Sequence, residues 1–159
     1  MPNNLPPETL SVKSWLESHG FHPNIRFLDQ STGTSQEAAD ALGVPLGQIS
    51  KSLVFYVVAT LEPILILVSG ANRVDKTKVG EYLGQKIKTA GPEFVLEKTG
   101  FTVGGVPPVG HKTPLKTLID KDLQQYSTVY SAAGSDHALF PISPSLLQGL
   151  TKGEVIPVC

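Results

Sequence analysis

The chain has 159 residues, of which 40% are hydrophobic, and its 13 Lys and Arg residues nearly balance 14 Asp and Glu residues for a net charge of −1. This length predicts a single domain, residues 1–159, that buries a core without disulfides or a structural metal. The balanced charge excludes a global basic field, so a polyanionic partner has to be held by a local patch. Cys159 has no partner for an internal disulfide, and the chain shows no export signal or membrane-length apolar run, so we expect a cytoplasmic protein.

Five segments carry helix signals. The first runs from Pro7 to a glycine stop at Gly20, and the second opens with the capping-box pair Thr34 and Glu37 and closes at Gly43. The other three are expected after Asp75, between Pro92 and Gly100, and from Pro144 through Leu147.

Strand signals lie between these helices. Two β-rich runs, 51–58 and 64–68, are separated by a turn and predict a hairpin that is buried on both faces and forms the centre of the sheet. Shorter strands are expected at 25–28, 129–132, 138–142 and 154–158. This interspersed order predicts a single domain of the α/β (α+β) class with a mixed sheet.

The segment from Gly100 to His111 is rich in glycine and proline. Gly104 and Gly105 can adopt positive φ and expose their N–H groups, and Pro107 and Pro108 fix the backbone that follows. Such a loop can cradle an oxyanion or a carbonyl oxygen. The alternative is an ordinary rigid turn.

Lys51 begins the most apolar strand, so we expect its ammonium at the sheet edge, where it could hold a carbonyl or a phosphate. The alternative is a solvated lysine that protects the strand from aggregation. The small residues Ser69, Gly70, Asn72 and Arg73 follow the second hairpin strand and form either a ligand-facing turn or a plain connection to the next helix.

Consecutive Ser135, Asp136 and His137 cannot form a catalytic triad, because neighbouring side chains point in different directions. His137 could line a pocket singly or belong to a polar turn. The four histidines, including His111, show no metal spacing, and no nucleotide or esterase motif is present, so we expect neither a metal nor a cofactor. The densest basic stretch of the sequence contains Lys76, Lys78, Lys86 and Lys88. These lysines either contact phosphates or form a solvated helix face.

Several of these motifs occur together in the order found in one family. They are Thr34–Ala39, Gln48–Phe55, Gly70–Asp75, the loop Gly100–Gly110, and Ala133 with Gly134. With them the chain resembles the free-standing YbaK/ProX-type aminoacyl-tRNA deacylases, which are related to the editing insertion of bacterial prolyl-tRNA synthetase. The resemblance covers about residue 10 to the C-terminus and implies that family's fold, a partly barrel-like mixed sheet surrounded by helices.

The resemblance implies hydrolysis of the ester that joins a wrong amino acid, such as Ala, Ser, Thr or Cys, to the 3' end of tRNA for proline. Prolyl-tRNA synthetase is a possible partner on this reading. Lys51 matches the family's active-site lysine, and Gly104–Pro108 matches its glycine loop, so catalysis is assigned to Lys51, Gly104 and Gly105. The expected substrate-binding residues are Ser69, Gly70, Asn72, Arg73, Val106, Pro107, Pro108, Gly134 and His137. The alternative is a non-catalytic module of the same fold that binds a tRNA end or a nucleotide-like ligand.

The chain departs from the cysteine-specific members of this family at two positions. Those members carry a serine before the glycine turn and an acidic residue shortly after it, and an alignment by eye places Ala132 and Leu139 there. In this register the polar groups associated with cysteine removal are absent, which favours Ala, Ser or Thr over Cys.

Overall fold

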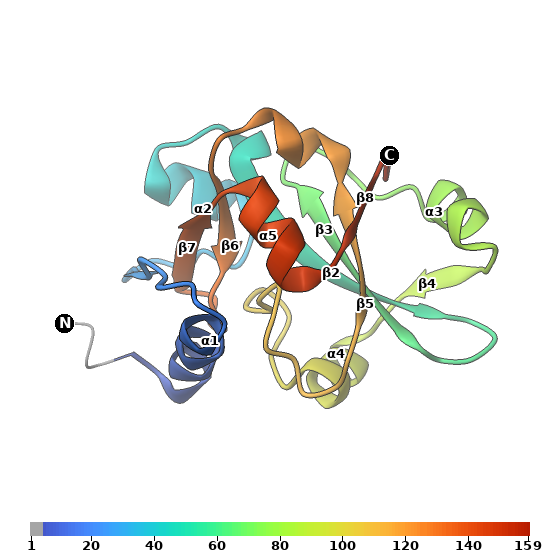
Figure 1. Cartoon of the computed structure of the whole chain (residues 1–159), viewed down its shortest axis with the longest axis horizontal. Coiled ribbons are helices and arrows are strands. Elements are labelled where there is room, and N and C mark those ends of the chain that lie inside the picture. The colour runs from blue at the N-terminus through green and yellow to red at the C-terminus, as the bar shows by residue number, and fades with distance from the viewer. Residues whose placement is uncertain (1–4) are drawn as a thin grey trace.

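The computed structural model describes residues 5–159, which form one mixed sheet of eight strands with helices on both faces (Figure 1). The strands pair in the order β1-β7-β6-β2-β3-β5-β8, and β4 pairs with β2 beside this path. Strand β2 runs antiparallel to β3 and β4 but parallel to β6. The predicted α/β class with a mixed sheet is confirmed. The strands are β1 Arg26–Phe27, β2 Ile49–Val57, β3 Pro63–Ser69, β4 Ile87–Thr89, β5 Lys116–Asp120, β6 Val129–Ala132, β7 Ala138–Ile142 and β8 Glu154–Ile156.

All five predicted helices are present in the structure. They could be predicted because the residues that begin and end each helix lie close together in the sequence. Thr34 accepts a hydrogen bond from the Glu37 amide at 3.1 Å, and the Glu37 carboxylate accepts one from the Thr34 amide at 3.1 Å. Gly43 closes this helix in the left-handed conformation, with φ of 69°. The helices are α1 Pro7–Ser18, α2 Ser35–Leu42, α3 Lys76–Leu83, α4 Pro92–Thr99 and α5 Pro144–Thr151, with 3-10 turns η2 Leu46–Gln48 and η3 Lys121–Gln125.

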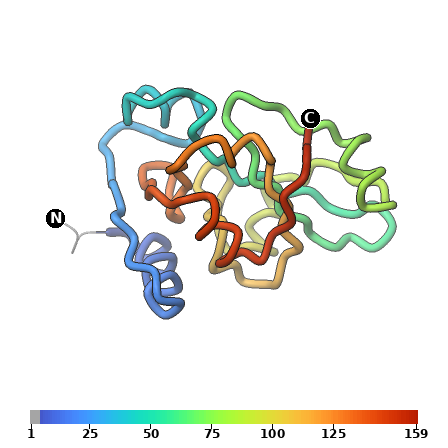
Figure 2. Tube along the Cα trace, turned by 45° about the horizontal axis from the view of Figure 1, so that its top comes forward, coloured from blue at the N-terminus to red at the C-terminus, as the bar shows by residue number. Residues whose placement is uncertain are grey.

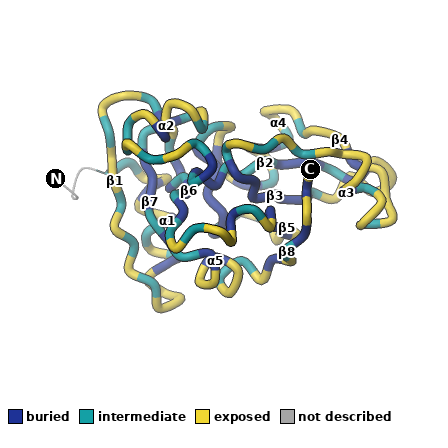
Figure 3. The backbone as a smooth tube through the Cα atoms, turned by 90° about the horizontal axis from the view of Figure 1, so that it is seen from above, coloured by how far each residue is buried: buried dark blue, intermediate teal, exposed yellow. Residues whose placement is uncertain are grey.

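The β2–β3 hairpin is the centre of the sheet and is covered on both sides, as predicted. Leu65 and Leu67 pack with α1, α4 and α5 on one face, whereas Ile66 and Val68 pack with Val79 of α3 on the other. Helix α2 packs against the start of β2. The buried strands form a continuous central layer under an exposed outer surface (Figure 3).

Two groups of elements lie at opposite ends of the molecule in both the cartoon and the Cα trace. Helices α1 and α2 lie at one end, and α3, β4 and the tip of the β2–β3 hairpin lie at the other (Figures 1 and 2). Strand β2 connects the two ends, since it pairs with β6 near its start and with β4 near its end. Strand β2 therefore runs from the end of the molecule that holds α2 to the end that holds α3 and β4.

Candidate functional site

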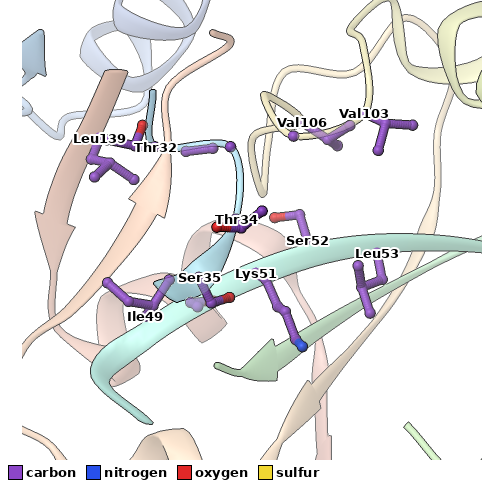
Figure 4. A pocket seen from close by; sticks show the side chains of 14 residues that line it. Thr32, Thr34, Ser35, Ile49, Lys51, Ser52, Leu53, Val103, Val106 and Leu139 are labelled. Carbon is purple, nitrogen blue, oxygen red and sulfur yellow. The ribbon is translucent and has the colours of Figure 1, made fainter. Parts of the chain in front are cut away.

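A cavity of about 260 Å³ opens beside the first half of β2 (Figure 4). Four separate segments enclose it: strand β2, the loop before α2, the glycine- and proline-rich segment 100–111 (the Gly/Pro loop), and the pair of strands β6 and β7. The volume lies just below the range typical of sites for drug-sized ligands, which suits a small group. Its lining consists of Thr32, Gly33, Thr34, Ser35, Ile49, Ser50, Lys51, Ser52, Leu53, Val103, Gly104, Val106, Ala132 and Leu139.

The cavity lies where the hydrogen-bond ladder of the sheet is interrupted. On the side away from β3, the pairing of β2 with β6 ends at Ser50, and the pairing with β4 begins at Phe55. Peptide groups in a strand alternate between its two neighbours, and the Ile49 carbonyl faces β3, where it accepts from the Gly70 amide. The peptide groups of Ser52 therefore face the gap. Lys51 was expected at the sheet edge; β2 is instead an interior strand with a local opening at this point.

Three serine hydroxyls at the cavity are buried without a hydrogen-bond partner. They belong to Ser35, Ser50 and Ser52, and Ser50 is only 1% exposed. Figure 4 shows the Ser52 side chain on the side of β2 that faces Thr34 and Val106. Burying a polar group without a partner costs free energy, so a polar ligand or water here would satisfy these hydroxyls.

The Gly/Pro loop closes the cavity from the side opposite β2. Gly104 has a φ of 94°, so a residue with a Cβ would be strained there, and that Cβ would lie in van der Waals contact with the backbone of Gly33. Gly104 and Val106 line the cavity, whereas Gly105 does not. The Gly105 amide donates to the Thr102 carbonyl at 3.0 Å, and this glycine packs on the Ser135 backbone.

His111 ties down the same loop. Its Nε2 lies 2.7 Å from the Pro107 carbonyl oxygen, an arrangement in which a protonated Nε2 donates to that oxygen. Burial lowers the pKa of His111 below 6.5, and the hydrogen bond to Pro107 opposes this only in part. His111 therefore favours the neutral form in the folded protein.

This low pKa predicts that stability falls with acidification. The unfolded chain takes up a proton at His111 as the pH drops below about 6.5, before the folded state does, so the free energy of unfolding decreases until the lower folded pKa is passed. Chemical denaturation between pH 7.5 and 5 measures this dependence. His111→Gln, which keeps a donor but does not titrate, should have a shallower dependence in this range. Equal slopes for the two proteins would contradict the assignment.

Lys51 leaves β2 on the side opposite Ser52 and points away from the cavity, although its backbone contributes to the wall (Figure 4). Burial and the nearby Arg73 guanidinium together lower the pKa of Lys51 from 10.5. In residues 5–159 no carboxylate lies within 4.0 Å of either cation. Two neighbouring cations without an anion are an arrangement that a phosphate would stabilise.

Most of the other residues predicted for the site have structural roles. The buried Asp120 carboxylate accepts from the Ser69 amide at 3.0 Å and from the Asn72 side chain at 2.8 Å. Gly70 packs tightly against the Leu46 carbonyl and Ser35. These contacts position the hairpin end beside α2, and Ser69, Gly70 and Asn72 do not themselves line the cavity.

The remaining predicted residues do not line the cavity. His137 Nδ1 lies 3.0 Å from the carbonyl oxygens of Leu28 and Gln30, so it anchors the segment after β1. Gly134 takes a φ of 91° and packs on the Glu8 carbonyl. Pro107 and Pro108 are buried within the loop.

Several cavity residues were not singled out from the sequence. The hydroxyls of Ser35, Ser50 and Ser52 were missed, although the Ser-Lys-Ser pattern in an otherwise apolar strand was a usable signal. Ala132 and Leu139, which the alignment by eye placed at the positions associated with cysteine removal, both line the cavity.

No group of three or more His, Cys, Asp or Glu side chains within residues 5–159 is placed to hold a metal. No helix in this part of the chain has the length and apolar character needed to cross a bilayer.

A family model and several known proteins match this chain, and they agree on the family. The family described as "Aminoacyl-tRNA editing domain" matches residues 29–150. The chain is 31% identical to "Uncharacterized protein YwhH" of Bacillus subtilis (strain 168), over 94% of this chain and 95% of that protein. It is 27% identical to "Putative Cys-tRNA(Pro)/Cys-tRNA(Cys) deacylase EbsC" of Enterococcus faecalis (strain ATCC 700802 / V583), over 76% of this chain and 74% of that protein.

Longer proteins and solved structures agree with this result. A proline–tRNA ligase of Limosilactobacillus fermentum (strain NBRC 3956 / LMG 18251) is 34% identical over 65% of this chain, but the match spans 19% of that ligase. A structure described as "Crystal structure of a putative trans-editing enzyme for prolyl tRNA synthetase" superposes with a TM-score of 0.92 and 44% identity, covering 98% of both chains. The protein therefore belongs to the aminoacyl-tRNA editing domain family.

Proposed function

We propose that the protein is a trans-editing hydrolase that removes a small wrong amino acid from tRNA for proline. Water attacks the ester carbonyl, the bond to the ribose oxygen breaks, and free amino acid and uncharged tRNA are released. The observation that carries this proposal is the cavity at the ladder gap of β2, which is lined both by three serines whose buried hydroxyls have no partner and by Gly104. A compact polar ester group is suited to such a space.

The reacting carbonyl is placed between β2 and the Gly/Pro loop. The Ser52 peptide, which faces the gap, and the Gly104 backbone offer fixed dipoles that favour the negative charge developing on the carbonyl oxygen. An aminoacyl ester is already activated, so a positioned water and a polarised carbonyl are sufficient for hydrolysis. This agrees with a cavity lining that contains no histidine or carboxylate.

Lys51 and Arg73 are assigned to the phosphate of the terminal nucleotide. Lys51 lies on the opposite side of β2 from the Ser52 hydroxyl, and Arg73 is near enough to lower the pKa of Lys51. Neither cation has a carboxylate within salt-bridge distance among the described residues. A phosphate held there positions the ester at the gap without being consumed in the reaction. On this account Lys51 acts on binding and orientation of the substrate.

Amino-acid selection is assigned to the apolar end of the cavity. Ile49, Ala132 and Leu139 form this end and bring no charge to it. The serine and acidic residue associated with cysteine removal are replaced by Ala132 and Leu139, so alanine is preferred over cysteine. The larger proline ring is excluded by volume, although apolar pockets discriminate by only about 1–3 kcal/mol per methylene.

The experiment is release of amino acid from tRNA for proline charged with Ala, Ser, Thr, Cys or Pro. Wild type is expected to hydrolyse alanyl-tRNA fastest and to leave prolyl-tRNA intact. No release from any ester would contradict the proposal and would favour a binding module that holds the tRNA end without turnover.

Enlarging the cavity should relax this selectivity. Leu139→Ala is expected to raise hydrolysis of prolyl-tRNA relative to alanyl-tRNA by about tenfold or more, because it removes the wall that excludes the ring. Leu147→Ala is the matched control: Leu147 is equally buried, at 1% against 2% exposed, but lies outside the cavity. Both variants should lose about 2–5 kcal/mol of stability. An equal change in selectivity in both would contradict the assignment.

A further inference from the structure

A second, larger hollow of about 670 Å³ lies between α3 and β4, at the end of the molecule away from α2 (Figure 1). It shares no lining residue with the cavity at β2. Its wall is formed by Lys76, Thr77, Gly80, Glu81, Gly84, Gln85, Lys86, Ile87 and Lys88. We call it the α3–β4 groove.

The groove carries three exposed lysines and one acidic residue. Ile87 packs into the core, so the strand alternation turns its neighbours Lys86 and Lys88 outward. Neither of these nor Lys76 has a carboxylate within 4.0 Å in residues 5–159, and Glu81 is the one acidic residue in the groove lining. Lys78 is excluded from this set, because its ammonium donates to the Cys159 carbonyl at 2.8 Å.

One of the groove cations, Lys76, lies on the same face of the sheet as Lys51. Lys51 extends from the face of β2 whose later residues pack with α3, and Arg73 lies just before that helix. The Lys76 ammonium lies 3.5 Å from the Thr89 hydroxyl, and Thr89 pairs with Phe55 of β2. Lys88 pairs with Tyr56, about 17 Å along the strand from Lys51, so strand alternation directs the Lys88 side chain to the opposite face of the sheet from Lys51, at the edge formed by β4.

We propose that the α3–β4 groove binds the sugar–phosphate backbone of the tRNA acceptor end while the terminal ester occupies the cavity at β2. This inference rests on the proposed function, since that function places the 3' end at Lys51. A chain of net charge −1 attracts RNA only through a local patch, and the groove lysines form one, with Lys76 on the Lys51 face of the sheet and Lys88 at its β4 edge. Such contacts carry no sequence information, so the groove supplies affinity and orientation.

The test compares two triple variants that remove the same charge. Lys76→Gln/Lys86→Gln/Lys88→Gln alters the groove, and Lys112→Gln/Lys121→Gln/Lys152→Gln alters exposed lysines elsewhere. Binding of uncharged tRNA for proline is measured over a series of salt concentrations. The groove variant should bind about tenfold more weakly at low salt, and its plot of log K against log salt should be shallower by about 2 to 3. The control variant should match wild type.

Hydrolysis of the alanyl ester of adenosine tests the editing activity independently of tRNA binding in the groove. That substrate reaches the cavity but has no backbone to bind in the groove, so the groove variant should hydrolyse it at the wild-type rate. Wild type that binds tRNA through the groove but hydrolyses no ester would support the groove and contradict the editing function. Three results would overturn the groove proposal: wild-type tRNA binding by the groove variant, equal weakening in both variants, or joint loss of tRNA binding and adenosine-ester hydrolysis. Retained tRNA binding with loss of binding to prolyl-tRNA synthetase would assign the groove to an acidic protein surface instead.

Discussion

Replacing Lys51 with glutamine is expected to lower kcat/KM for hydrolysis of alanyl-tRNA for proline by about a hundredfold or more. The substitution keeps a polar side chain but removes the cation, leaving Arg73 alone beside the terminal phosphate. Without the cation the ester is held less accurately in the cavity, and hydrolysis loses much of the rate advantage that comes from fixed positioning of the substrate. The loss in kcat/KM therefore exceeds that expected for one surface contact. Single-turnover and steady-state release of alanine measure it.

Two further variants test whether the loss of activity is due to the charge at position 51. Lys112→Gln removes an exposed lysine outside the cavity and should leave kcat/KM near the wild-type value. Lys51→Arg keeps the charge and should retain more activity than Lys51→Gln. Activity of Lys51→Gln within about threefold of wild type would show that Lys51 is a solvated strand residue and not part of the site.

Gly104→Ala is expected to reduce deacylation by about tenfold to a hundredfold. At a φ of 94° the new methyl is strained, and it would lie 3.4 Å from the Gly33 carbonyl oxygen, which lines the cavity with Gly104. Relief of the backbone strain at this φ moves the loop away from the position where it polarises the ester. The measurement is kcat for alanine release, with the melting temperature recorded in parallel.

Gly100→Ala is the control for backbone strain. Gly100 has a φ of 83° at the end of α4, outside the cavity, and its nearest neighbour would be Lys112 Cβ at 3.6 Å. Both variants should lose about 1–2 kcal/mol of stability, but Gly104→Ala alone should lose activity. Similar activity losses in the two would mean that Gly104 acts only through stability.

The predictable parts of the fold are those whose signals are local. The Thr34 and Glu37 capping box, the glycines after the helices, and the two β-rich runs of the hairpin specify their elements within a few residues. Strands β4 and β5 were missed. β4 has three residues and pairs only with the end of β2. The burial of β5 depends on parallel pairing with β3 and β8, which are distant in sequence.

The candidate site was predicted in outline only. The Lys51 and Gly104 segments were identified from the sequence, and both line the cavity. The ladder gap was not predictable, because it depends on where β6 stops pairing and β4 begins. For the same reason Ser50 and Ser52 appeared as ordinary strand residues, and Asn72 appeared ligand-facing although it binds buried Asp120.

The most direct test of the account is a crystal structure of the protein with a non-hydrolysable amide analogue of alanyl-adenosine that carries a 5' phosphate. The account predicts the alanyl group in the cavity between Ser52 and Gly104, with its carbonyl directed at the gap in the ladder and the phosphate beside Lys51 and Arg73. Binding of the alanyl group outside this cavity, or of the phosphate away from both cations, would contradict the account.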